Sequence, residues 1–111
     1  MKKAIVETTL KRSNGFCEVC GDYGDGMALH HRKLKSRGGK DEVSNLLVCH
    51  HQCHNLGTDS IHLNPEKSER KGWMVPSWAD PKEYPLHYPG GEIVLLQDDG
   101  SMKVLRGQGW E

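Results

Sequence analysis

Apolar residues are scarce in this chain. They make up 35% of its 111 residues, whereas roughly 45–50% is usual for globular proteins, an average that also counts glycine. A chain of this length usually forms one domain, and small domains bury a smaller part of their surface than large ones. The composition therefore predicts one compact unit whose thin core is supplemented, most simply by a structural metal.

The chain also has no long apolar segment. Nothing in it approaches the roughly 18 consecutive apolar residues of a membrane-spanning helix, and Glu7 interrupts the N-terminus before a signal-type apolar stretch develops. We therefore expect no membrane partner and a cytoplasmic location. Because the cytosol keeps thiols reduced, the four cysteines are expected to be metal ligands or free thiols rather than disulfides.

A net charge is absent as well, but the charges are unevenly distributed. Residues 1–55 hold 9 Lys/Arg and 6 Asp/Glu, whereas residues 56–111 hold 6 and 9. The basic half contains a run without acids that follows a histidine pair, formed by Arg32, Lys33, Lys35, Arg37 and Lys40. Such a run is commonly a solvated loop, and only its position beside the histidine pair favours contacts with phosphates.

Short helical and extended patterns follow one another in mixed order, which predicts an α+β fold. We expect helices over residues 2–11 and 65–71, a helix beginning between residues 49 and 56, strands over residues 27–31 and 46–48, and a loop over residues 32–44. Residues 76–91 contain four prolines and are expected to be extended connecting chain. Residues 92–97 and 102–105 flank a turn that contains Gly100, which predicts a β-hairpin.

Four cysteines form two close pairs. Cys17 and Cys20 have two residues between them, Cys49 and Cys53 have three, and 28 residues separate the pairs. Paired thiolates at such spacing suit one closed tetrahedral zinc site. The alternatives are four buried reduced thiols, a redox Cys-x-x-Cys, and a zinc site in which His50 or His51 replaces one cysteine.

Histidine is abundant, and most of the seven histidines lie between residues 30 and 62. An imidazole can ligate a divalent metal or accept a proton from water near neutral pH, so neighbouring histidines can divide these tasks. His30 and His31 are adjacent, and in a strand their side chains would point to opposite faces. Taken alone, such a pair is more often two surface or core histidines.

The order of these residues resembles a known motif. Cys17–Gly21, Leu29-His30-His31, Gly38-Gly39, Ser44–Cys49 and Cys53-His54 resemble the HNH endonuclease motif with its zinc-binding cysteines. This likeness covers Phe16 to about Asn55, and the rest of the chain more loosely resembles small bacteriophage HNH proteins.

The resemblance implies a ββα-metal core with flanking helices and a C-terminal hairpin. Residues 1–75 would form a zinc-stapled nuclease domain and residues 76–111 an extension. His31 would be the general base, and Asn45 would hold the loop that orients it. His30 and His54, with His62 as a further ligand, would bind one catalytic Mg²⁺, Mn²⁺, Ni²⁺ or Zn²⁺. The implied partners are DNA and phage terminase or packaging proteins.

Two other functions compete with the nuclease. A non-catalytic zinc finger that binds nucleic acid needs the cysteines and the basic run, but it does not need His30, His31, Asn45 or His54. A packaging accessory in a phage assembly would use the C-terminal hairpin for docking. Trp73, Trp78 and Trp110 are expected to anchor the C-terminal segment by burial rather than to stack on bases.

Overall fold

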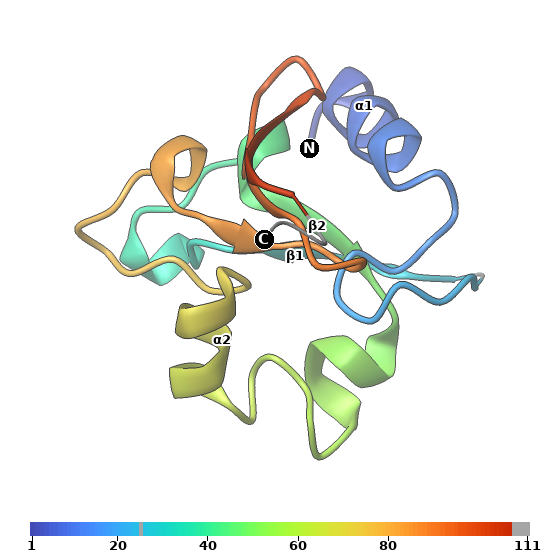
Figure 1. Ribbon diagram of the computed structural model, residues 1–111, viewed down its shortest axis with the longest axis vertical. Coiled ribbons are helices and arrows are strands. Elements are labelled where there is room, and N and C mark those ends of the chain that lie inside the picture. Colours follow the sequence, from blue (N-terminus) through green and yellow to red (C-terminus); the bar gives the residue numbers. More distant parts are fainter. Residues whose placement is uncertain (25, 108–111) are drawn as a thin grey trace.

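The computed structural model describes residues 1–24 and 26–107, and these form a mixed helix and sheet fold (Figure 1). The predicted α+β class is therefore confirmed. No helix in this part of the chain is long and apolar enough to cross a membrane. The elements in chain order are α1 (Lys3–Ser13), β1 (Ala28–His31), η1 (Lys35–Arg37), η2 (Val43–Asn45), β2 (Leu46–Cys49), η3 (Gln52–Leu56), α2 (Pro65–Lys71), η4 (Pro81–Glu83), β3 (Leu86–His87), β4 (Ile93–Leu96) and β5 (Met102–Arg106).

A short antiparallel hairpin lies at the centre of the molecule, between α1 and α2 (Figure 1). Its strands β1 and β2 pair from Ala28↔Cys49 to His31↔Leu46. All residues of β2 are buried. The two strands were predicted, and the connecting loop contains the single 3₁₀ turns η1 and η2, which the polar sequence did not indicate.

Helix α1 matches the predicted segment and ends at Asn14, whose φ of 53° lies in the left-handed region. Asparagine tolerates this conformation better than most residues. The buried face differs from the apolar pattern, because Leu10 is exposed while Thr9 and Ser13 are buried. Thr9 can be buried because its hydroxyl donates to the carbonyl of Ile5 at 2.8 Å.

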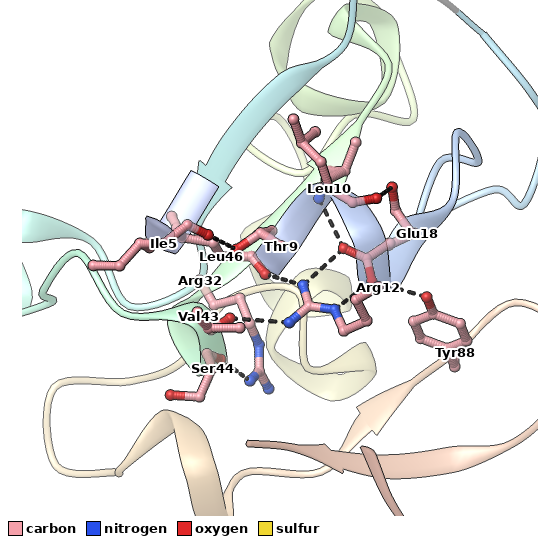
Figure 2. A network of polar contacts seen from close by, with 12 residues as sticks. Ile5, Thr9, Leu10, Arg12, Glu18, Arg32, Val43, Ser44, Leu46 and Tyr88 are labelled. Atoms are coloured by element: carbon pink, nitrogen blue, oxygen red, sulfur yellow. Dashed lines mark hydrogen bonds and ion pairs between the residues drawn. The ribbon is translucent and has the colours of Figure 1, made fainter. Parts of the chain in front are cut away.

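An ion pair between Arg12 and Glu18 connects α1 with the rest of the fold (Figure 2). Arg12 Nε and Nη2 each lie 2.8 Å from a carboxylate oxygen of Glu18, and both side chains are almost completely buried. Glu18 also accepts from the Val48 amide at 2.9 Å and from the Tyr88 hydroxyl at 2.8 Å. Because every charge has partners, the pair can be buried, and it joins the N-terminal helix, β2 and the C-terminal segment.

The apolar core joins residues from the whole described chain: Cys17, Leu47, Cys49, Ile61, Trp73, Met74, Leu86, Val94 and Leu96. It is therefore continuous across residue 75, after which the sequence suggested an extension. The C-terminal strands form one sheet in the order β3-β4-β5. The β4–β5 hairpin was predicted, whereas β3 lies in the segment expected to be extended connecting chain and pairs Leu86 with Val94.

The burial of Arg32 contradicts one prediction for the basic run. It is 0% exposed, and its guanidinium donates to the carbonyls of Gly72, Ser44, Pro81 and Tyr84 at 2.8–3.0 Å. Burial lowers its pKa to about 9. Arg32 is therefore not a DNA contact but a buried link between β1 and the segment that follows α2.

The tryptophans differ from one another. Trp73 is buried, as predicted, but Trp78 is 82% exposed and is not a buried anchor. Trp110 lies outside the described residues.

Candidate functional site

Three imidazoles converge beside the central hairpin. His30, His54 and His62 each offer a ring nitrogen, and these atoms all lie within 4.8 Å of one another. The Nε2 atoms of His54 and His62 are 3.0 Å apart. This separation suits two nitrogens that share one metal ion, since metal–imidazole distances are about 2.0–2.1 Å.

His30 is held in one orientation by the backbone. Its Nε2 lies 2.7 Å from the carbonyl oxygen of Trp73, so this nitrogen donates. Nδ1 is then the nitrogen with the free lone pair, and this buried atom has no hydrogen-bond partner among the described residues. Burial lowers the pKa of His30 to about 3 and keeps the ring neutral. A neutral imidazole whose other nitrogen donates to a carbonyl is the usual form of a metal-ligating histidine.

Backbone hydrogen bonds bring His62 to His54 although eight positions separate them in the chain. The amide of Ile61 donates to the Cys53 carbonyl at 2.8 Å, and the amide of His62 donates to the His54 carbonyl at 3.2 Å. The intervening residues 55–60 therefore do not separate the two rings.

Asn45 is buried at the end of η2, and its side chain clamps the basic loop. Its Oδ1 accepts from the Lys33 amide at 2.7 Å, while Nδ2 donates to the carbonyls of Lys33 and Lys40 at 3.1 and 3.0 Å. The contacts go to the backbone at both ends of the loop and not to the ring of His31.

His31 is the last residue of β1 and is partly exposed, whereas the preceding His30 is buried. Its Nε2 lies 2.7 Å from Asp41 Oδ1, and Lys35 Nζ lies 3.6 Å from the same oxygen. The hydrogen bond from His31 lowers the pKa of Asp41. No sequence pattern pointed to Asp41, because no spacing rule links a carboxylate in a polar loop to a histidine ten positions earlier.

A second group contains sulfur. Cys17, Cys20, His50 and Cys53 each offer one ligand atom within 4.8 Å of the others. His50 Nδ1 is 3.4 Å from Cys20 Sγ and 4.0 Å from Cys53 Sγ. The amides of Val19 and Cys20 both lie 3.4 Å from Cys17 Sγ, which favours a thiolate at this position.

Cys49 is not part of this group, which corrects its assignment as the fourth ligand. It is the last residue of β2, is 0% exposed in the apolar core, and burial raises the pKa of its thiol. His50 takes the place beside the three sulfurs, and its Nε2 lies 3.4 Å from the Tyr23 carbonyl.

The turn after β2 explains why His50, and not Cys49, lies beside the three sulfurs. His50 and Cys53 have two residues between them, the same spacing as Cys17 and Cys20. The chain then continues as the π-helical turn η3, closed by a bond from the Gly57 amide to the Gln52 carbonyl at 2.9 Å. Such turns accommodate one more residue than an α-helical turn.

The basic run is divided between structural and exposed residues. Lys33 Nζ donates to the Ala79 carbonyl at 3.0 Å, and Arg37 Nη1 lies 3.0 Å from Glu69 Oε2. Lys35 and Lys40 are exposed. Of the predicted DNA contacts, these two are the ones most available to a phosphate.

A hairpin that carries adjacent histidines, followed by a helical turn that carries another, has the arrangement expected of a ββα-metal nuclease. Residues 17–60 match the model of the HNH endonuclease family. The matched segment contains His30, His31, Asn45 and His54. No curated protein and no solved structure matches the chain.

Proposed function

We propose that the protein is a metal-dependent endonuclease that hydrolyses DNA phosphodiester bonds. The observation that carries the proposal is the convergence of His30, His54 and His62, with the unpartnered Nδ1 of His30 one residue from His31. The match to a family of endonucleases over the same segment supports it.

The three imidazoles fit one divalent cation. They are neutral donors of intermediate softness, which suit zinc, nickel, cobalt or manganese better than magnesium, an ion that prefers oxygen. When bound, the ion would act as a Lewis acid on the phosphate and the leaving oxygen. His30 is held by Trp73, and His54 and His62 are held through their backbones, so the donors are oriented before a metal arrives.

His31 is proposed as the general base. With Nε2–H held by Asp41, the neutral ring presents Nδ1 as the proton acceptor. The oxygen of a water molecule attacks phosphorus, and its proton passes to His31. The bond from phosphorus to one sugar oxygen breaks, and that oxygen keeps the electron pair and takes a proton from solvent. General base catalysis of this kind contributes about 10²- to 10⁴-fold in rate.

We propose that Cys17, Cys20, His50 and Cys53 hold a structural zinc ion. A closed set of three sulfurs and one imidazole is a common structural zinc site. Such a site would supplement the thin apolar core and would fix the turn that carries His54.

DNA phosphates are proposed to contact Lys35 and Lys40, the exposed members of the basic run. A bacteriophage origin, terminase or packaging partners and a cytoplasmic location stay predictions from the sequence.

The test is cleavage of supercoiled plasmid by zinc-loaded protein with magnesium, manganese, nickel or no added ion. The parent should convert plasmid to open-circle or linear DNA with at least one ion, and His31→Ala should not. His87→Ala removes an exposed histidine of β3 and should cut like the parent. A folded parent that retards DNA in a gel but does not cut it with any of the tested ions would favour the non-catalytic zinc finger instead.

A further inference from the structure

Trp78 is an exposed aromatic residue whose ring packs against a neighbouring aromatic side chain. Its side chain is 82% exposed, and its ring packs against Tyr84 at 6.5 Å between centroids and 73° between planes. The Tyr84 hydroxyl in turn donates to the Glu69 carbonyl at 2.9 Å. The edge contact leaves a large part of the indole uncovered.

This indole lines a pocket of about 440 Å³, within the range of small-ligand sites. Two segments form the pocket, residues 33–42 and 78–82, and its lining includes Lys33, Lys40, Glu42, Trp78, Asp80 and Lys82. The bond from Lys33 Nζ to the Ala79 carbonyl joins the loops. Gly39 permits the close turn, because a Cβ there would lie 1.7 Å from the Lys33 carbonyl oxygen. The pocket is therefore built by fixed contacts.

The charges of the lining limit what it can bind. Lys82 lies 3.5 Å from Asp98, and Lys33 is engaged with Ala79, whereas Lys40 is exposed and forms no ion pair among the described residues. The carboxylates of Glu42 and Asp80 disfavour a ligand with several negative charges. A flat uncharged ring beside a single phosphate suits one indole face and one free lysine.

The pocket adjoins the candidate catalytic residue through the same loop. Lys40 lines the pocket, and the next residue, Asp41, contacts His31 at 2.7 Å. Asn45 Nδ2 donates to the Lys40 carbonyl, so the backbone between the pocket and Asp41 is held in place.

We propose that this pocket binds one unpaired nucleobase of a DNA strand, stacked on Trp78, with its phosphate at Lys40. Bases inside a duplex are already stacked and paired, so the preferred substrate would contain a single-stranded segment beside the bond that is cut. The proposal rests on the proposed nuclease function for its choice of DNA as ligand.

The test measures binding apart from cleavage. Zinc-loaded His31→Ala protein is titrated into a short fluorescein-labelled single strand and into the matching duplex, and anisotropy is followed at one salt concentration. Adding Trp78→Ala should weaken single-strand binding by roughly 5- to 150-fold, the range expected when an aromatic that stacks on a base is removed. Duplex binding should stay unchanged, and Trp78→Phe should keep part of the affinity.

Tyr23→Ala is the matched control, because Tyr23 is also an exposed aromatic, at 68%, but does not line the pocket. It should bind both DNAs like its parent. Unchanged single-strand binding by the Trp78→Ala protein, or an equal loss on both DNAs, would overturn the pocket proposal. If Trp78→Ala weakens single-strand binding alone and the wild-type protein never cuts plasmid, the pocket proposal is supported and the nuclease proposal is refuted. The failures of the two proposals are therefore distinguishable.

Discussion

The Nε2 atom of His31 lies 2.7 Å from the Oδ1 atom of Asp41. Asp41 follows Lys40, whose carbonyl accepts from Asn45 Nδ2 at 3.0 Å. Asn45 therefore acts on His31 indirectly: it fixes the backbone of the loop, the loop places the carboxylate, and the carboxylate holds the ring.

Asp41→Ala should lower the rate of plasmid cleavage by about 10- to 100-fold, as expected for loss of a residue that orients a functional histidine. Asp41→Asn keeps an acceptor oxygen and should retain more activity than the alanine variant. Glu83→Ala, which removes an exposed carboxylate elsewhere, is the control. Equal cleavage rates for Asp41→Ala and its parent would show that the contact does not serve the reaction.

Asn45→Ala should reduce the free energy of unfolding by about 2–4 kcal/mol, because it removes three partly buried hydrogen bonds to the backbone of Lys33 and Lys40. Urea unfolding followed by circular dichroism measures the loss. Asn55→Ala truncates an exposed asparagine and should change little. A fully stable Asn45→Ala protein would argue against the clamp.

Arg32→Lys should destabilise the fold by about 3 kcal/mol or more, since an ammonium cannot serve the four carbonyls that the planar guanidinium reaches. Lys35→Ala should leave stability unchanged and reduce the salt slope of DNA binding by about one. A stable Arg32→Lys protein whose DNA binding depends less on salt would instead indicate that Arg32 contacts DNA.

His50→Ala should lose the structural zinc and unfold, whereas Cys49→Ala should keep one zinc ion per chain with a smaller loss of stability. The reason is that His50, not Cys49, lies with Cys17, Cys20 and Cys53. Elemental analysis of the purified variants measures the zinc content. Zinc that persists in His50→Ala and disappears in Cys49→Ala would restore Cys49 as a ligand.

Asp98 predicts a pH-dependent contribution to stability. Burial opposes its ionisation, but the Ser44 amide and Lys82 outweigh burial and lower the pKa of the carboxyl. The folded state then binds fewer protons here than the unfolded chain, so the contribution is present above about pH 4 and is lost as the pH falls through the lowered folded value. Asp98→Asn should be less stable than the parent at pH 7, and urea midpoints of the two should approach each other in acid. A constant difference at every pH would contradict this.

Local patterns in the sequence predicted much of the fold. Pro65 and Gly72 bracket α2 as first helical residue and left-handed cap, and Gly100 lies in the turn of the β4–β5 hairpin. The grouping of His30, His54 and His62 was implied by the motif alone, because its order and spacing are specific.

Contacts between distant segments were harder to predict. A basic run suggests exposure, yet Arg32 is buried because carbonyls 12 to 52 positions away surround it. The spacing of Cys49 and Cys53 suggested a ligand pair, but Cys49 ends a buried strand and the turn presents His50. Trp78 was expected to be buried because it is a large aromatic residue, and nothing in the neighbouring sequence indicated that its side chain stays exposed.

Arg32 also limits how residues 17–60 could be moved into another protein. Two of its carbonyl partners, Pro81 and Tyr84, lie beyond the family match at residues 17–60. A fragment cut to that match would lose these acceptors and would leave a buried cation beside His31 without its full set of partners. A chimaera that grafts these residues onto another protein would therefore need the chain through Tyr84, or an apolar residue in place of Arg32.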